Sequence, residues 1–172
     1  MTTIEIREAG LRDLQDLAEL FEVLMEVPSN IEAMGRQLAK VTEDPHYFLA
    51  VACDGDKVIG TAMGIECYDL VGSCHPFLVV ENVVVNPDYR GQGAGKMLMK
   101  RLEQFAEERV CSYIIFVSSG YREKAHQFYA RWAIPAIIKG LKNSLGYWDN
   151  GSGKGSLSRL GASAAGFLFI HF

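Results

Sequence analysis

The stretch that decides the fold of this 172-residue chain reads Val83-Val84-Val85-Asn86-Pro87-Asp88-Tyr89-Arg90-Gly91-Gln92-Gly93-Ala94-Gly95-Lys96. It starts inside an apolar strand, Phe77 to Val85, that Asn86-Pro87-Asp88 terminates. Three glycines follow, and an amphipathic helix begins directly after them. Glycine lets the backbone approach an anion closely, and a helix start offers free N–H groups and a positive dipole end. The stretch therefore predicts a site for a phosphate-bearing ligand, with Arg90 and Lys96 adding charge. The alternative is a glycine-rich connection without a ligand.

Two well-known phosphate loops do not fit this stretch. A P-loop requires G-x-x-x-x-G-K-[ST], whereas Gly91 and Gly95 have three residues between them, and Met97 stands where Ser or Thr must hold magnesium. A dinucleotide fingerprint requires G-x-G-x-x-G. Its third glycine falls at Lys96 when the motif starts at Gly91, and at Leu98 when it starts at Gly93. The expected ligand therefore needs neither magnesium nor a dinucleotide cradle.

Apolar periodicity on both sides of the stretch predicts the element order βααβββαβαβ. Strands are expected at 3–7, 47–53, 57–67, 77–85, 113–117 and 134–141. Helices are expected at 11–27, 31–43, directly after the glycine loop, and at 123–132. The early strands pair as hairpins, with Asp54-Gly55-Asp56 as a turn, and the later strands alternate with helices. This order predicts an α/β (α+β) fold with a mixed sheet and helices on both faces.

Composition sets the broad class. Apolar residues make up 49% of the chain and charged residues 22%, which is ordinary for a globular domain and excludes a disordered or collagen-like chain. The net charge of −4 argues against a nucleic-acid partner bound by bulk charge. No cysteine pair has C-x-x-C spacing, and we expect no metal. The N-terminus lacks the pattern of a signal peptide, and no apolar run approaches the ~18 residues of a membrane span, so we expect a cytoplasmic protein without a membrane partner.

Two motifs carry a family resemblance. Arg90 to Gly95 fits [QR]-x-x-G-x-[GA], and Ala125-His126-Gln127-Phe128-Tyr129 fits A-x-x-[FL]-Y. With both motifs at this distance, residues 3–145 resemble the GNAT superfamily, the Gcn5-related N-acetyltransferases. The resemblance implies a mixed, mostly antiparallel central sheet flanked by helices. It also implies acetyl-CoA as a co-substrate and no metal.

The resemblance further implies which residues bind acetyl-CoA. The strand residues Val83, Val84 and Val85 present backbone groups to the pantetheine arm, in a slot made by a splay between this strand and the next. The backbone amides of Arg90, Gly91, Gln92, Gly93, Ala94 and Gly95 hold the pyrophosphate, with Lys96 nearby. Arg122 stands where many relatives have an Asn that contacts the CoA arm. Arg122 is expected to meet a CoA phosphate or an anionic substrate group, or to face solvent.

Acetyl transfer needs a base, an acid and an oxyanion donor. By the same resemblance, Glu81 is the candidate base that deprotonates the amine, often through water. Desolvation amid valines would raise its pKa, and the alternative is an exposed residue at an alternating position. Tyr129 is the candidate acid for the leaving thiolate, and the alternative is an aromatic residue packed beside Phe128. A backbone N–H around Val83 would be the oxyanion donor.

The acceptor is left open by the sequence. The first hypothesis is a primary amine of a small molecule, acetylated by direct transfer in a ternary complex. The second is a protein N-terminus or lysine, and the third is a CoA-binding module without turnover. Twelve Asp and Glu residues lie in residues 1–60, either as an acidic rim that steers cationic amines or as a solvated helix face.

The C-terminal segment differs in composition from the rest. We expect an acetyltransferase domain over residues 1–145 and a Gly/Ser-rich tail over 146–172, which holds 6 of the 17 glycines. The tail contains Gly151-Ser152-Gly153-Lys154-Gly155-Ser156 and ends near Phe167-Leu168-Phe169-Ile170. That apolar patch either docks on the domain, docks on a second chain in a homodimer, or belongs to an appended reading frame.

Overall fold

The computed structural model describes residues 3–117 and 167–171. Its strands are β1 (Ile4–Glu8), β2 (Tyr47–Asp54), β3 (Lys57–Cys67), β4 (Phe77–Val85), β5 (Tyr113–Val117) and β6 (Phe167–His171). Its helices are α1 (Leu14–Met25), α2 (Ile31–Glu43) and α3 (Ala94–Glu108), with short 3-10 turns η1 (Leu11–Asp13) and η2 (Pro87–Tyr89). The predicted order is confirmed as far as β5. The predicted helix at 123–132 and strand at 134–141 lie outside the described residues.

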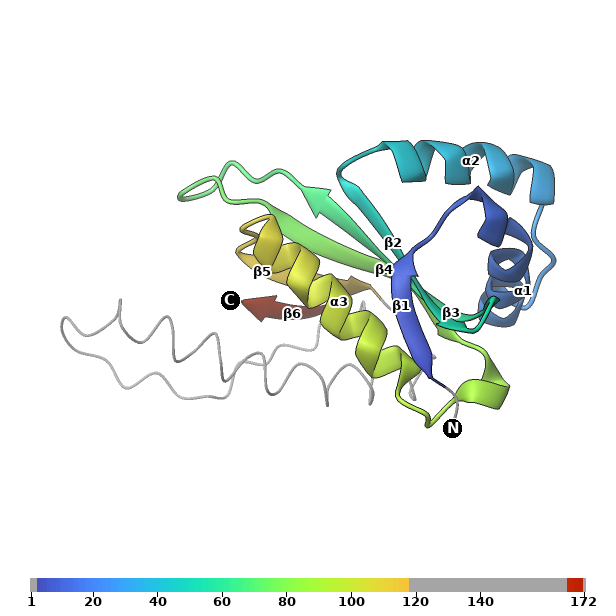
Figure 1. The fold of residues 1–172 in the computed structure, drawn as a ribbon. Coiled ribbons are helices and arrows are strands. Elements are labelled where there is room, and N and C mark those ends of the chain that lie inside the picture. Colours follow the sequence, from blue (N-terminus) through green and yellow to red (C-terminus); the bar gives the residue numbers. More distant parts are fainter. Residues whose placement is uncertain (1–2, 118–166, 172) are drawn as a thin grey trace.

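The sheet has six strands in the order β1-β2-β3-β4-β5-β6 (Figure 1). All neighbours are antiparallel except β4 and β5, which are parallel. The prediction of an α/β (α+β) fold with a mixed, mostly antiparallel sheet is therefore confirmed. Strand β6 comes from the C-terminal segment and pairs with β5, Val117 opposite Phe167. This part of the segment belongs to the sheet, whereas the division of the chain at residue 145 stays a prediction.

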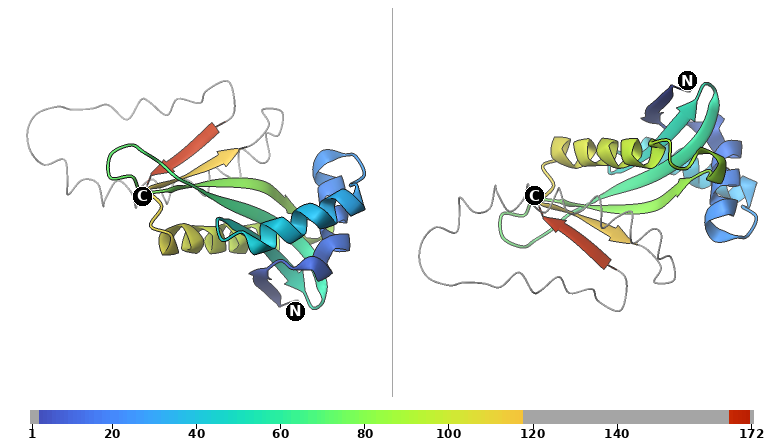
Figure 2. Two further views of the ribbon diagram at one scale, coloured as in Figure 1. Left: turned by 90° about the horizontal axis from the view of Figure 1, so that it is seen from above. Right: turned by 90° about the horizontal axis from the view of Figure 1, so that it is seen from below.

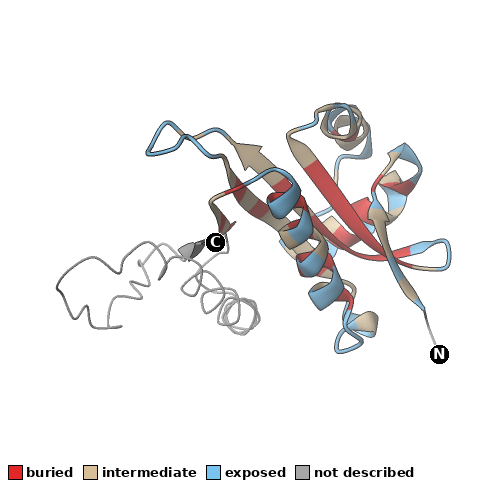
Figure 3. Ribbon diagram, turned by 60° about the vertical axis from the view of Figure 1, so that its left-hand side comes forward, coloured by how far each residue is buried: buried red, intermediate tan, exposed pale blue. Residues whose placement is uncertain are grey.

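Helices cover both faces of the sheet (Figure 2). Strand β2 shows why, because its side chains alternate strictly between two hydrophobic clusters. Phe48, Ala50 and Ala52 pack with α3, whereas Leu49, Val51 and Cys53 pack with α1 and α2. Figure 3 shows the result: α3 is exposed on its outer side, and the strands beneath it are buried. Burial of apolar surface on both faces stabilises the sheet by roughly 25 cal/mol per Å².

Helix α3 lies close to the sheet because β3 carries two glycines beneath it. A Cβ atom at Gly60 would lie 3.1 Å from the carbonyl oxygen of Val84, and one at Gly64 would lie 3.1 Å from Leu102 Cδ2. Both distances are tighter than ordinary van der Waals contact. Gly64 therefore lets Leu102 of α3 approach β3 closely, and Gly60 leaves room for the Val84 carbonyl of β4.

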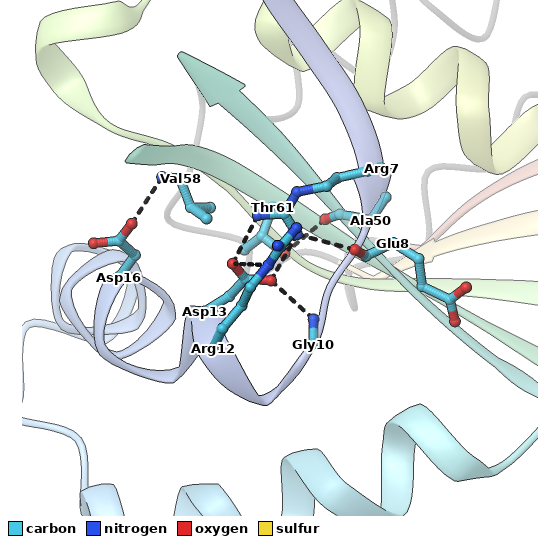
Figure 4. A network of polar contacts seen from close by, with 9 residues as sticks. All are labelled: Arg7, Glu8, Gly10, Arg12, Asp13, Asp16, Ala50, Val58 and Thr61. Atoms are coloured by element: carbon cyan, nitrogen blue, oxygen red, sulfur yellow. Dashed lines mark hydrogen bonds and ion pairs between the residues drawn. The ribbon is translucent and has the colours of Figure 1, made fainter. Parts of the chain in front are cut away.

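Helix α1 is shorter than the predicted 11–27. Its first turn is the 3-10 turn η1, because the Asp13 carboxylate accepts the amide N–H of Gly10 at 2.8 Å and two N–H groups of Arg7 at 2.7 Å (Figure 4). Its C-terminal end comes at Met25, where Glu26 adopts a left-handed conformation with φ of 60° and caps the helix. The predicted boundaries missed both ends, since a local carboxylate and a left-handed cap shortened the regular helix.

Candidate active site

A β-bulge interrupts β4 at Asn82. Thr61 of β3 pairs with Val84 and Met63 pairs with Glu81, so one residue of β3, Ala62, lies opposite two of β4, Asn82 and Val83. Asn82 has a φ of 54°, a left-handed conformation that Asn tolerates better than most residues. Before the bulge, Leu78 and Val80 face α3; after it, Val83 and Val85 do, while Val84 joins the cluster under α1. The bulge therefore exchanges the two faces of the strand.

The pairing of β4 with β5 ends just before the bulge. Leu78, Val79 and Val80 pair with Ile114, Ile115 and Phe116, and within the described residues nothing on β5 pairs with β4 beyond them. Alternate amide and carbonyl groups of a strand point to opposite edges. Among the described residues, the backbone groups of Glu81 to Val85 on the β5 side therefore have no strand partner. The splay expected beside Val83, Val84 and Val85 stays a prediction, because the chain that follows Val117 lies outside the described residues.

Glu81 lies at the start of this unpaired edge. Its Cα partner Met63 packs against the cluster under α1 and α2, which places the carboxylate on that face of the sheet, opposite α3. Glu81 is partly buried. Burial raises its pKa above the ordinary 4.5, and a hydrogen bond from the backbone of Asn82 partly opposes the shift. The expected desolvation of this carboxyl group is confirmed.

The glycine loop has the backbone of an anion cradle. Gly91 and Gly93 have φ of 80° and 93°, and open space surrounds the position of a Cβ at each, so the left-handed backbone alone requires glycine. Gly93 is the N-cap of α3 and supplies no side-chain cap. Across the part of the chain that the structure describes, no amide from Gly91 to Lys96 donates a hydrogen bond; the first to do so is that of Met97, to Gly93. Six consecutive N–H groups are therefore available at the positive end of a helix.

The polar side chains of the loop hold its shape. The Nε of Arg90 donates to the carbonyl of Val85 at 3.2 Å, and Gln92 donates to the carbonyl of Asp88 at 3.3 Å. Asn86 accepts the amide N–H of Asp88 at 3.0 Å and so caps η2. Lys96 is exposed, and Ala94 is buried under the start of α3. The sequence-predicted residues from Glu81 to Lys96 thus lie along one continuous path of strand, loop and helix.

Other predicted residues lie beyond what the structure describes. Tyr129 and Arg122 fall in this part of the chain, together with His126. The bulge at Asn82 is the feature that sequence reasoning missed. Its only local signal is the residue type, since Asn is enriched among residues with positive φ.

A family model described as "Acetyltransferase (GNAT) family" matches residues 14–133. The chain therefore belongs to the GNAT acetyltransferase family, and it is an N-acetyltransferase. The expected family is confirmed.

Relatives of known name agree with this assignment. Thialysine N-epsilon-acetyltransferase of Sus scrofa is 26% identical over 142 residues, which cover 75% of this chain and 82% of that protein. Streptothricin acetyltransferase of Streptomyces lavendulae is 31% identical over 71 residues, covering 41% of this chain and 34% of that protein. Among solved structures, a putative acetyltransferase from Agrobacterium tumefaciens has a TM-score of 0.67 at 25% identity, covering 88% of this chain and 98% of that chain.

The family uses acetyl-CoA, and the described residues fit its phosphates. The six free amides and the left-handed glycines form a run of backbone donors at a helix start, which matches an anionic group. Among the residues described, no three His, Cys, Asp or Glu side chains gather where they could hold a metal ion. None of the described helices is long and apolar enough to cross a membrane.

Proposed function

We propose that this chain transfers the acetyl group of acetyl-CoA to a primary amine of a small molecule, by direct transfer in a ternary complex. The observation that carries the proposal is the position of Glu81, a partly buried carboxylate on β4 directly before the bulge. The edge of β4 that follows Glu81 on the β5 side has no strand partner among the described residues, and it leads to the glycine loop. Two relatives bear names that specify small amine-bearing acceptors, thialysine and streptothricin.

The co-substrate side of the site is made of backbone. In the proposal, the amides of Gly91, Gln92, Gly93, Ala94 and Gly95 bind the pyrophosphate, supported by Arg90 and Lys96. The edge of Val83 to Val85 binds the amide groups of the pantetheine arm, as an added strand would. Arg122 contacts a phosphate of the same molecule. Acetyl-CoA supplies the activated acyl group, and these residues fix its direction along β4.

The chemical step is assigned to three groups. Glu81 removes a proton from the ammonium of the acceptor, directly or through a water molecule, because only the free amine attacks a carbonyl. A backbone N–H near Val83 donates to the carbonyl oxygen as it gains negative charge. Tyr129 gives its proton to the leaving sulfur. A raised pKa suits Glu81 for this role, since a stronger base takes a proton from an ammonium more readily.

The test is thiol release from acetyl-CoA over a panel of primary amines, with Glu81→Gln and Tyr129→Phe as variants. We expect turnover on at least one small amine and a fall in kcat of about 10²–10⁴-fold for Glu81→Gln, the usual contribution of a general base. The acid limb of the pH–rate profile should lie above pH 4.5 and disappear in Glu81→Gln. Binding of acetyl-CoA without turnover on any amine would instead favour a non-catalytic CoA-binding module.

A protein N-terminus or lysine is the competing acceptor, and a peptide panel in the same assay distinguishes it. We also propose a cytoplasmic location, no nucleic-acid partner, and a homodimer. Sedimentation at two protein concentrations tests the homodimer directly.

A further inference from the structure

A cavity lies toward the C-terminal end of α3, away from the glycine loop. It has a volume of about 250 Å³ and opens between the C-terminal ends of α2 and α3, at the start of β2. Figure 1 shows both helices ending toward the same side of the molecule. The lining residue of α3 that lies nearest the loop is Arg101, seven residues after Ala94, or about 10 Å along the helix. Neither the loop nor Glu81 lines it.

Part of the cavity lining is a pair of stacked phenylalanine rings with an arginine against each ring. The guanidinium of Arg101 lies 4.2 Å from the ring centre of Phe48, which stacks on Phe105 at 4.9 Å and 20°. Arg109 covers the other side, 5.1 Å from the ring of Phe105. Such stacking holds a guanidinium in place without using its N–H groups. Both arginines are therefore fixed before any ligand binds.

The two arginines differ in their remaining donors. Arg109 donates to the carbonyl of Pro45 at 2.8 Å and lies 3.7 Å from the carboxylate of Glu66. Arg101 makes one long contact, 3.4 Å to Glu108, from a group that carries five N–H donors. Its side chain is 29% exposed. Arg101 thus presents N–H groups to the cavity, in the geometry that suits a carboxylate.

The rim of the cavity also carries negative charge without an ion-pair partner among the described residues. Asp44 is occupied, since it accepts the amide N–H of His46 at 2.9 Å and lies 3.0 Å from its ring. Glu8 of β1 and Glu43 of α2 have no ion pair within the described residues. Glu43 is also the last residue of α2, where the helix dipole adds negative potential. This rim favours a cation.

We propose that this cavity binds a small zwitterion of the α-amino-acid class. The ammonium lies between Glu8 and Glu43, and the carboxylate accepts from Arg101. One ligand thus matches the remaining donors of Arg101 and the two unpaired carboxylates, whereas Asp44, Glu108 and Arg109 already have partners in the structure. The proposal is independent of the acetyl-transfer function, because none of the described residues of that site lines the cavity.

The test is to titrate the whole chain with L-leucine, L-glutamine, L-phenylalanine and L-lysine. Binding is measured by calorimetry and by the shift in melting temperature. We expect at least one of them to bind and to raise the melting temperature. Its amide, which lacks the carboxylate, and its N-acetyl form, which lacks the ammonium, should each bind about tenfold or more weakly. Absence of binding by all four, or equal binding of either derivative, would overturn the proposal.

Variants locate the binding. Glu43→Gln and Arg101→Gln should each weaken affinity about tenfold or more, whereas Glu5→Gln, on β1 outside the cavity, should leave it unchanged. Glu81→Gln should also leave it unchanged; a loss there would place the amino acid in the acceptor site and refute the cavity. Glu43 is exposed, so its variant tests the site even if Arg101→Gln unfolds.

Discussion

Two strand–connection–helix units, β1–η1–α1 and β4–η2–α3, send their helices to opposite faces of one sheet. In the first, carboxylates at the start of the helix tie it to its neighbours, which we call a closed start: Asp13 accepts from Gly10 and Arg7, and Asp16 accepts the amide of Val58 at 2.8 Å (Figure 4). In the second, the amides from Gly91 to Lys96 donate to no described group. A closed start belongs to the scaffold, whereas an open start is prepared for an external anion.

The largest effect on the free energy of unfolding is expected when the ion pair at the start of the closed unit is removed. Asp13 is 4% exposed and Arg7 23%, so Asp13→Ala leaves a partly buried guanidinium without its partner. We expect a loss of about 3 kcal/mol in the free energy of unfolding, the lower end for broken buried pairs. Urea denaturation measures it.

A matched control is Glu32→Ala, which removes an exposed ion pair with Arg36 within α2. Its cost should stay below about 0.5 kcal/mol. Similar losses in the two variants would show that the closed start contributes no more than a surface pair.

The second effect comes from the left-handed glycine of the open unit. Gly93→Ala places a Cβ at a φ of 93° and should cost about 1–2 kcal/mol of stability, with a clear loss of acetyl-CoA affinity by calorimetry. Gly10→Ala is the corresponding change in the closed unit, where φ is −134° and the space is open. Gly10→Ala should change stability by less than about 0.5 kcal/mol. If Gly93→Ala and Gly10→Ala both bind acetyl-CoA as tightly as the unmodified chain, the open helix start is not the phosphate site.

A smaller effect should follow from closing the open unit. Lys96 is the third residue of α3, so Lys96→Glu puts a carboxylate beside the free amides. Thermal melting should show a gain of about 0.3–1 kcal/mol without ligand, because an acid favours a helix N-terminus. Acetyl-CoA affinity should fall, since the new charge repels phosphate. Lys100→Glu, one turn further along α3, serves as the control and should change both quantities less.

The smallest expected effect on stability at neutral pH comes from the protonation of Asp13. The hydrogen bonds from Arg7 hold the pKa of Asp13 below its ordinary 3.8. An acid with a lowered pKa contributes stability that is present above its unfolded pKa and is lost as pH falls through the folded one. We expect the unfolding free energy to fall below about pH 4, and to fall less steeply in Asp13→Asn. Parallel curves for the two proteins would contradict this assignment.

Much of this fold was predictable because its signals are local. The ends of α2 and of β3, β4 and β5 match the predicted boundaries. Each is bounded by a turn or capping residue, such as Asn30, whose side chain accepts the amide of Ala33 at 3.0 Å. The glycine loop was predictable for the same reason, since φ requirements select residue types.

The bulge at Asn82 was not predictable, because a bulge is defined by the register of the partner strand. Nothing in Glu81-Asn82-Val83 alone indicates that a single residue of β3, Ala62, lies opposite both Asn82 and Val83. The pairing of β6 with β5 is non-local in the same way, because about fifty residues separate them in the chain. Local sequence patterns therefore predicted the individual parts of the site, whereas their relative positions depend on the strand register, which is non-local.

The bulge also has a consequence for how this strand can change in evolution. Side chains along a strand alternate with a period of two, so one residue more or less exchanges inside and outside for everything beyond it. Removing Asn82 would send Val83 and Val85 to the layer under α1 and Val84 to the layer under α3. A single deleted codon would thus act like several simultaneous core substitutions. In this strand, length is under tighter constraint than composition.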